Sequence, residues 1–266
     1  MSKIDLDYAN ALKLILPDAE SISLTLVGCG GTGSWLAPAV ARVGKLLIER
    51  FQKDVKLTFV DPDRVEEKNI YRQNFCAAEI GRNKAETLAY RFGLAWGLEI
   101  RAVPAEFSNL DWEQLAVVIG CVDNAAARRS IQEAAGSRAW WLDAGNTKNG
   151  GQVLLGLGGG KRADAFNLPG YCGWLPSPAK QHPELVEATP VEELEPTTQE
   201  LSCAEMALQD SQGLAINQRM AAEAADYLVR MLITKDLRKY ATYIDLESGT
   251  SQSKYISMKE MRRWMK

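Results

Sequence analysis

An apolar run that ends in a glycine cluster constrains the fold of this chain more than any other feature. Residues 24–33 read LTLVGCGGTG, and a stretch of helical character follows. Gly28, Gly30 and Gly33 match G-x-G-x-x-G between a strand and a helix, where glycines let the backbone turn tightly and approach phosphate oxygens. The segment predicts a phosphate-binding strand-turn-helix unit, although a purely structural tight turn would also use glycines.

Short apolar runs then alternate with amphipathic stretches as far as residue 157. Strands are expected at residues 22–27, 56–60, 99–103, 115–120, 140–144 and 151–157, and helices at 6–16, 33–51, 82–95 and 125–135. This alternation predicts an α/β protein with a Rossmann-like, doubly wound and mostly parallel sheet.

The alternation stops near residue 158. Residues 159–201 contain six prolines and an acidic stretch, and a connection this long is typically a lid, a binding loop or a disordered segment. A helix is expected at 209–234, and a hairpin of strands in a C-terminal extension, 235–266. We expect a single domain over residues 1–266.

Composition narrows the classes of function. The net charge of −3 disfavours a nucleic-acid surface. No apolar run is long enough to span a membrane and no signal-peptide pattern is present, so we expect a cytoplasmic protein without a membrane partner. The five cysteines are scattered, which favours reduced thiols and leaves no C-x-x-C zinc pair. His182 is the only histidine, so a histidine-dependent nucleophile has little support.

An acidic residue ends the second expected strand. Asp61 opens the string DPDRVEEKNIYRQN, and in a nucleotide-binding sheet an acid at this place accepts hydrogen bonds from ribose hydroxyls. Asp-Pro-Asp is also a favourable turn sequence, so a structural role is the alternative, and it suits Asp63 better.

Polar and basic side chains follow at a spacing that suits a triphosphate. Asn69, Arg72 and Gln73 share one short segment, and Lys84 follows a turn. An arginine grips phosphate oxygens with a fork of donors, and a lysine neutralises them as a point charge. A solvated charged loop is the alternative. A dinucleotide oxidoreductase would need the glycines and the acid but not the Arg-Gln pair.

Two further residues could carry chemistry. Asp123 follows an apolar strand, where a carboxylate opens into the ligand crevice and could hold Mg²⁺; the alternative is that Asp123 or Asn124 caps the next helix. Cys203 precedes the long C-terminal helix. A helix N-terminus lowers the pKa of a thiol, so Cys203 is the best placed of the five cysteines for nucleophilic work, a role that the residues alone leave open.

Together these motifs resemble the adenylating enzymes related to ubiquitin-activating enzyme, typified by ThiF and MoeB. The matching segments are GCGGTG, DPDRVEEKNIYRQNF, IGRNKAE, CVDN after a strand, and a cysteine ahead of a helix that reads NQRMAAEAADYLV. Their order and spacing cover residues 24–232. Within the family, the chain is most similar to the ThiF-related protein of the PRTRC cassette.

The resemblance implies ATP-dependent adenylation of the C-terminal carboxylate of a ubiquitin-like or sulfur-carrier protein that ends in Gly-Gly. The tail would thread under residues 159–201 as a crossover loop, Cys203 could then receive the acyl group or sulfur, and a homodimer is expected. By the same resemblance, the ATP phosphates would be held by Gly28, Gly30, Gly31 and Gly33, and the ribose by Asp61. The phosphates or the incoming carboxylate would be contacted by Asn69, Arg72, Gln73 and Lys84. Mg²⁺ would be bound by Asp123.

Two departures from the family pattern bear on function. Relatives place an N-terminal arginine that reaches the ATP of the partner subunit, whereas residues 1–23 contain none; Lys3 or Lys13 could replace it. The zinc-binding C-x-x-C pairs of many relatives are also missing. The missing arginine leaves open a catalytically inactive adaptor that binds a nucleotide or a ubiquitin-like fold. An NAD-dependent oxidoreductase, which uses the same glycines and acid, is the other rival function.

Overall fold

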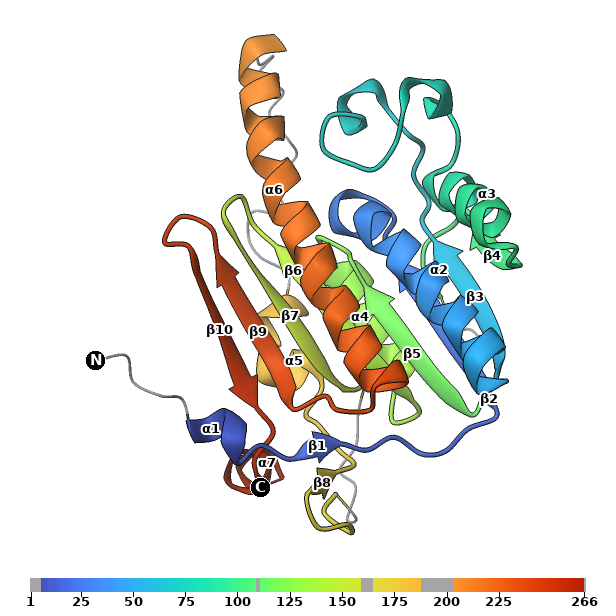
Figure 1. Cartoon of the computed structure of the whole chain (residues 1–266). Coiled ribbons are helices and arrows are strands. Elements are labelled where there is room, and N and C mark those ends of the chain that lie inside the picture. Colours follow the sequence, from blue (N-terminus) through green and yellow to red (C-terminus); the bar gives the residue numbers. More distant parts are fainter. Residues whose placement is uncertain (1–5, 109–110, 159–164, 188–202, 266) are drawn as a thin grey trace.

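The computed structural model describes residues 6–108, 111–158, 165–187 and 203–265, of which residues 6 and 203–214 are described by their backbone alone (Figure 1). Its centre is an eight-stranded sheet in the order β10-β9-β7-β6-β5-β2-β3-β4. The strands are β2 (Ser21–Val27), β3 (Asp54–Val60), β4 (Ile100–Val103), β5 (Leu115–Gly120), β6 (Ala139–Asn146), β7 (Gly150–Leu157), β9 (Lys239–Asp245) and β10 (Thr250–Tyr255). A small second sheet pairs β1 (Lys13–Leu14) with β8 (Tyr171–Cys172).

Strand directions divide the large sheet into two parts. The five neighbours β6, β5, β2, β3 and β4 are parallel, and β7, β9 and β10 are antiparallel additions at one edge. The expected Rossmann-like, doubly wound and mostly parallel sheet is confirmed, together with the C-terminal hairpin, which is β9 and β10.

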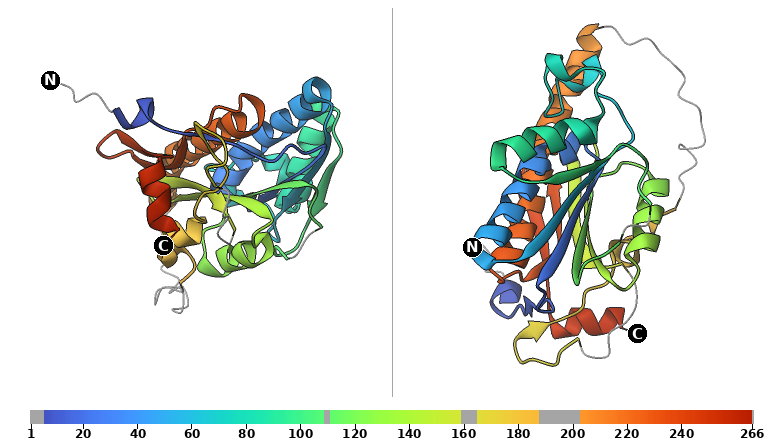
Figure 2. Two further views of the ribbon diagram at one scale, coloured as in Figure 1. Left: turned by 90° about the horizontal axis from the view of Figure 1, so that it is seen from below. Right: turned by 90° about the vertical axis from the view of Figure 1, so that its right-hand side faces the viewer.

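Helices cover both faces of this sheet (Figure 2). One face carries α2 (Gly31–Phe51), α3 (Lys84–Trp96) and α6 (Cys203–Leu228), and the other carries α4 (Ala125–Ala135) and α5 (Pro178–Gln181). The remaining helical elements are α1 (Leu6–Ala9), η1 (Glu67–Asn69), η2 (Ala77–Glu79), η3 (Pro183–Leu185), the π-helical turn η4 (Val229–Ile233) and α7 (Met258–Trp264).

The sequence of the central strands follows from this layering. Strand β5 reads LAVVIG and is buried at all six positions, because strands flank it on both sides and helices cover both faces. Parallel strands in such a position are continuously apolar rather than alternating. The helices between them have defined ends: Asn83 caps α3 by accepting the N–H of Glu86 (3.0 Å), and Gly97 ends it at φ +60°.

The expected helix at 6–16 is wrong beyond its first turn. Helix α1 ends at Ala9, and the chain then extends into β1. Leu12 donates its N–H to the carbonyl of Ile256 (2.8 Å), and Leu14 is buried in the core. Pairing with segments far away in the sequence therefore outweighs the local helical periodicity of this stretch.

The middle of the expected crossover loop at 159–201 is folded. Residues 165–187 contain β8, α5 and η3, and they bury Trp174 and Leu175 in the main core. Gln181 fixes this segment to the sheet by donating to the carbonyl of Leu155 (3.0 Å). The flanking stretches 159–164 and 188–202 lie outside the described residues, so the threading of a tail stays a prediction.

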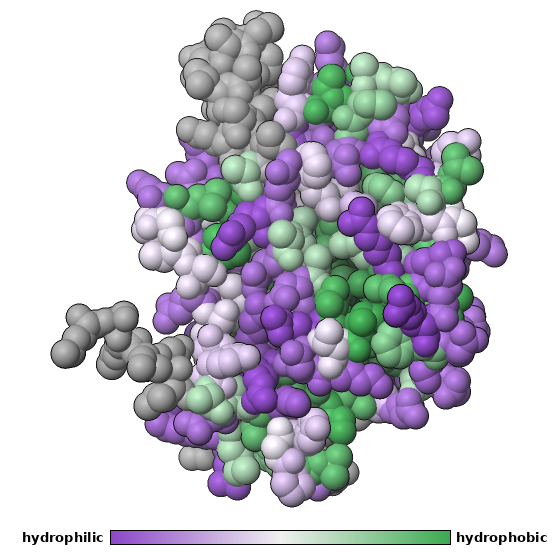
Figure 3. Space-filling view, viewed as in Figure 1, coloured by the Kyte–Doolittle hydropathy of each residue, from purple (hydrophilic) through white to green (hydrophobic). Residues whose placement is uncertain are grey.

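The surface seen in Figure 3 mixes hydrophobic and hydrophilic residues over α2 and α6. Exposed apolar side chains on α2 include Leu46, Ile48 and Phe51. Within the part of the chain that the structure describes, none of the helices combines the length and the apolar character needed to cross a bilayer.

Candidate active site

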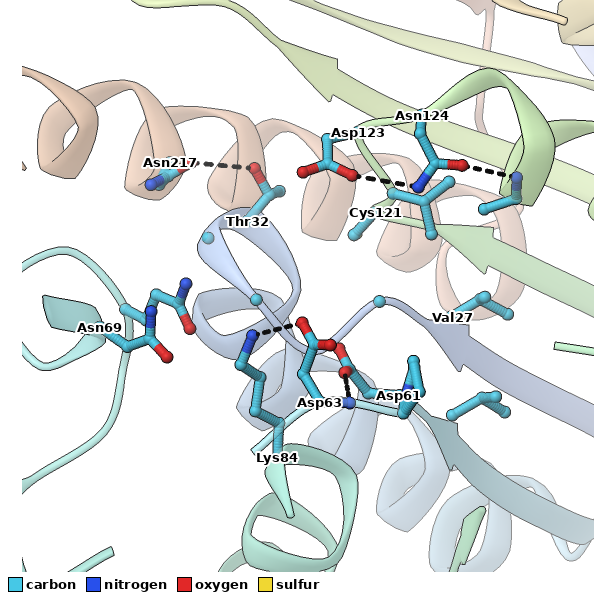
Figure 4. Close-up of a pocket in the computed structure, with 18 of the residues that line it drawn as sticks. Val27, Thr32, Asp61, Asp63, Asn69, Lys84, Cys121, Asp123, Asn124 and Asn217 are labelled. Carbon is cyan, nitrogen blue, oxygen red and sulfur yellow. Dashed lines mark hydrogen bonds and ion pairs between the residues drawn. The ribbon is translucent and has the colours of Figure 1, made fainter. Parts of the chain in front are cut away.

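A cavity of about 930 Å³ lies at the carboxyl ends of the parallel strands, where ligands bind in open α/β sheets. Nine of the residues expected from the sequence line it: Gly28, Gly30, Gly31, Asp61, Asn69, Arg72, Gln73, Lys84 and Asp123. Figure 4 shows Asp61, Asp63 and Lys84 on one side of the cavity, with Asp123 and Asn124 opposite. Segments more than 90 residues apart in the sequence thus meet in one site.

The loop between β2 and α2 depends on its glycines. Gly28 has φ +86°, and an added Cβ would lie 2.6 Å from the carbonyl oxygen of Cys121. A Cβ on Gly33, which lies behind the cavity lining, would overlap the carbonyl oxygen of Gly28. Gly30 is the N-cap residue of the 21-residue helix α2 and provides no side-chain cap. The amides and dipole at this helix N-terminus favour an anionic ligand.

Asp61 holds this loop in place. The side chain is buried, and Oδ2 accepts the backbone N–H of Cys29 (2.6 Å) while Oδ1 accepts that of Asp63 (2.8 Å). Burial raises the pKa of the Asp61 carboxyl, and the two backbone hydrogen bonds and the nearby charge of Lys84 oppose this rise. The carboxylate therefore has a structural role in addition to the predicted contact with ribose.

The turn after Asp61 aims Lys84 into the cavity. Asn83 donates to the carbonyl oxygens of Asp61 and Asp63, both at 2.9 Å, and so joins this turn to the start of α3. Lys84 is the first residue of α3, and its buried Nζ lies 2.8 Å from Asp63 Oδ2. The structural role expected for Asp63 includes this ion pair.

The segment at 69–73 forms another wall of the cavity. Asn69 Oδ1 accepts the N–H of Glu66 (2.9 Å), which closes the turn η1. The carbonyl of Arg72 accepts the indole N–H of Trp35 in α2 (3.2 Å). Gln73 is buried, and its Oε1 has no hydrogen-bond partner among the residues that the structure describes. A buried amide oxygen at a cavity wall is a group that a ligand donor could satisfy.

The two alternatives for Asp123 and Asn124 separate clearly. Asn124 is the N-cap of α4 and accepts the N–H of Ala127 (2.8 Å). Asp123 is exposed in the cavity, where Oδ1 accepts weakly from Asn124 Nδ2 (3.4 Å). No group of three metal-ligating side chains occurs within the described part of the chain. A single carboxylate is enough for Mg²⁺ in a phosphate-binding site, because the ion keeps several water ligands there and takes the others from substrate phosphates.

Cys203 lies apart from this site. It is the first residue of α6, and its side chain is outside the described residues. Asn217, in the same helix, lines the cavity. At 1.5 Å per residue, the 14 intervening steps place the backbone of Cys203 about 21 Å along the helix from Asn217. An acyl transfer to Cys203 would therefore require a rearrangement, and the role stays a prediction.

Of the two lysines that could supply the N-terminal cation, only Lys13 is described, and it does not line this cavity. Lys13 lies in β1, at the end of the sheet opposite the N-terminus of α2 (Figure 1). Lys3 lies outside the described residues. Neither lysine therefore has a described position near the phosphate loop of its own chain.

Sequence reasoning missed a polar cluster that joins α6 to the phosphate loop. Thr32 Oγ1 lies 3.2 Å from Asn146 Oδ1 and 3.4 Å from Asn217 Oδ1, and Asn146 Nδ2 donates to Asn217 Oδ1 (3.1 Å). A Cβ on Gly31 would lie 2.7 Å from Asn217 Oδ1. The available signal was a polar residue, Asn217, beside Ile216 on the buried face of a helix.

Comparison with known proteins decides the family. The sequence model of the ThiF family matches residues 13–258. The chain belongs to the ThiF family. The resemblance read from the motifs is thereby confirmed, and no curated protein matches the chain.

Solved structures of MccB share the fold of this ThiF-family chain. E. coli MccB with succinimide is 14% identical, with a TM-score of 0.56 over 88% of this chain and 63% of MccB. E. coli MccB with ATP is 16% identical, with a TM-score of 0.55 over 95% and 67%. The microcin C7 biosynthetic enzyme MccB with N-formylated MccA is 15% identical, with a TM-score of 0.55 over 88% and 64%. The chain thus spans about two thirds of the length of MccB.

Proposed function

We propose that this chain is an adenylyltransferase that uses ATP and Mg²⁺ to activate the C-terminal carboxylate of a small ubiquitin-like or sulfur-carrier protein. The observation that carries the proposal is the composition of one cavity. A glycine loop at a helix N-terminus, a buried acid, two cations and an exposed carboxylate line the same space. Membership of the ThiF family and the fold shared with MccB, which has been solved with ATP, support it.

In this reaction, a carboxylate oxygen of the substrate forms a bond to the α-phosphorus of ATP. The bond from that phosphorus to the bridging oxygen breaks, and pyrophosphate leaves with the electron pair. The amides at the start of α2, together with Arg72 and Lys84, would hold the phosphates and offset the charge that builds on the leaving group. Asp123 would hold Mg²⁺, which would offset the negative charge of the phosphates when bound.

Lys84 can exchange its ion-pair partner with little loss of free energy. Its ion-pair partner in the structure is Asp63, whose side chain is 64% exposed. An ion pair with a solvated carboxylate contributes little free energy. The Nζ of Lys84 can therefore turn to a phosphate oxygen, which carries more charge, when the nucleotide enters.

Several features fit a protein tail as the second substrate. A cavity of about 930 Å³ is at the upper end of the range for ligand pockets, about 300–1,000 Å³. MccB has been solved with N-formylated MccA. The resemblance to ThiF and MoeB adds the expectation of a Gly-Gly terminus, a crossover loop at 159–201 and a homodimer.

The proposed compartment is the cytoplasm. Free thiols are expected there, and the described cysteines with free thiols are Cys29, Cys76, Cys121 and Cys172.

The rival functions use fewer of these features. An NAD-dependent oxidoreductase would use the glycine loop and Asp61, but it gives no role to Arg72, Gln73 and Lys84 in the same cavity. An inactive adaptor would bind the nucleotide without releasing pyrophosphate. Substrate-dependent pyrophosphate release separates the adaptor from the enzyme.

The test is ATP–pyrophosphate exchange with the variant Asp123→Ala, using a neighbouring-gene small protein that ends in Gly-Gly as substrate. Loss of a metal ligand removes several kcal/mol of charge stabilisation, so the rate should fall about 100-fold or more. Asp54→Ala is the matched control, because Asp54 is an exposed acid at the start of β3, away from the cavity. Exchange that survives Asp123→Ala unchanged would count against the assignment.

A further inference from the structure

A buried ion pair contacts the loop that carries Asp123. Arg128 of α4 and Asp143 of β6 are both buried, and Arg128 Nε lies 3.2 Å from Asp143 Oδ1. The same guanidinium donates through Nη2 to the carbonyl oxygen of Val122 (2.7 Å). Neither side chain lines the cavity. The pair therefore contacts the loop through Val122, from outside the cavity lining.

Two glycines make room for this arrangement. A Cβ on Gly145 would lie 2.9 Å from Arg128 Nη2 and 3.4 Å from Asp143 Oδ2. A Cβ on Gly120 would lie 3.0 Å from Trp141 Nε1 and 3.5 Å from Asp143 Oδ1. A side chain at Gly145 would therefore displace the guanidinium, whereas one at Gly120 would press on Trp141 and make only ordinary contact with the carboxylate. The ion pair thus fits a space that the neighbouring strands leave open.

Stability alone does not account for the pair. Removing two charges from water is costly, and well-packed apolar residues of similar volume are often as stable as a buried ion pair. Burial raises the pKa of the Asp143 carboxyl, which Arg128 opposes, and Asp143 Oδ2 has no hydrogen-bond partner among the described residues. What the pair does provide is a fixed donor for the carbonyl of Val122.

The loop between β5 and α4 is therefore anchored on both sides of Asp123. Arg128 holds the carbonyl of Val122, the residue before it. Asn124, the residue after it, is fixed as the N-cap of α4. These contacts constrain the backbone on both sides of Asp123, and its carboxylate lies in the cavity (Figure 4).

We propose that Arg128, held by Asp143, is a positioning residue that aims the Asp123 carboxylate at the phosphate-bound Mg²⁺ of the proposed reaction. This inference rests on the proposed function and names the residues that set the geometry of its metal contact. Partners that orient a metal ligand typically change metal affinity by about 10- to 100-fold when they are removed. The affinity for ATP without Mg²⁺ should be nearly unaffected, because the loop glycines, Lys84 and Arg72 are untouched.

The experiment measures ATP binding by calorimetry, with Mg²⁺ and with EDTA, for the double variant Arg128→Met/Asp143→Leu. Both charges are removed together, so no buried charge is left unpaired and the fold should persist. The dissociation constant in EDTA divided by that in Mg²⁺ should fall by about tenfold or more relative to the wild type, as it should in Asp123→Asn. The constant in EDTA alone should stay close to that of the wild type. Arg129→Met is the matched control: its Nη1 also donates to a carbonyl, that of Val186 (2.7 Å), outside this loop.

Each outcome decides between the two claims. A folded double variant that keeps the wild-type ratio overturns the positioning role of Arg128 and leaves the proposed function intact. A wild-type chain that binds ATP equally with and without Mg²⁺ overturns the metal contact at Asp123 and this inference with it. Should the double variant fail to fold, Arg128→Lys serves instead: it keeps a charge beside Asp143 but lacks the fork that reaches Val122. Faster amide hydrogen exchange across residues 121–125 is expected in either variant.

Discussion

At the scale of single residues, the site depends on close approaches that only glycine allows. Gly28 turns the chain at φ +86°, and Gly33 lets helix α2 pack directly against the carbonyl of Gly28. Asp61 then fixes the turn by accepting the N–H of Cys29. Burial also raises the pKa of the Cys29 thiol well above its ordinary value, which makes this cysteine a structural residue and not a nucleophile.

Gly33→Ala tests this dependence. The added Cβ would overlap the carbonyl oxygen of Gly28, so the loop must shift. Overpacking of this kind costs about 1–3 kcal/mol, and we expect that loss in the free energy of unfolding together with weaker ATP binding. Gly173→Ala is the control, since its Cβ would meet no atom closer than 3.6 Å. Denaturant titration and calorimetry measure both effects; equal behaviour of the two variants would contradict this account of the loop.

At the scale of elements, α6 is tied to the phosphate loop through one buried side chain. Asn217 accepts hydrogen bonds from Thr32 in α2 and Asn146 in β6. It joins three elements that lie far apart in the sequence. Helix α6 therefore contributes to the shape of the proposed nucleotide site, although its first residue, Cys203, lies well away from it.

Asn217→Ala should loosen this junction. The Asn146 amide loses its acceptor, and Thr32 Oγ1 keeps only Asn146 Oδ1 as a partner. The loss in the free energy of unfolding should therefore be about 0.5–1.5 kcal/mol, and the phosphate loop should bind ATP less tightly. Gln218→Ala is the matched control, because Gln218 is exposed in the same helix. Thermal unfolding with and without ATP checks both effects. A ligand-induced stabilisation that is the same in both variants would refute the role of Asn217.

The sequence predicts the parts of the site that are local. The glycine loop, Asp61 and Lys84 each lie at the end of a strand or the start of a helix, so a strand pattern and a turn signal are enough to place them. Asn217 and the Arg128–Asp143 pair escape this reasoning, because their roles come from contacts between elements. The same limit explains β1: its partner, β8, lies about 150 residues away, and the helical periodicity of residues 6–16 does not encode that pairing.

At the scale of the whole molecule, the C-terminal hairpin and α7 extend the core beyond the parallel sheet. Tyr240 of β9 and Met261 of α7 are buried in the same hydrophobic core as β2 and β5. Burial raises the pKa of Tyr240 to about 12. The free energy of unfolding at alkaline pH therefore tests whether Tyr240, and with it this extension, is buried as in the structure.

The sign of this effect follows from proton counting. Between pH 10 and 12 the unfolded chain loses the Tyr240 proton while the folded chain keeps it, so stability falls as the pH rises. The fall is on the order of 2 kcal/mol. Tyr240→Phe should remove that part of the decline in urea titrations at pH 9 and 12, and Tyr90→Phe, at an exposed position, should not. Identical declines in both variants would contradict the packing of Tyr240.

The central claim is that the cavity grips a triphosphate, and titration of the wild-type chain with ATP and with NAD in the presence of Mg²⁺ tests it most directly. We expect ATP to bind and NAD to bind far more weakly. Lys84→Ala should weaken ATP binding by about tenfold or more, since a partly desolvated charge-assisted contact contributes about 1.5–3 kcal/mol. Tighter binding of NAD than of ATP, or ATP binding that is indifferent to Lys84, would contradict the account.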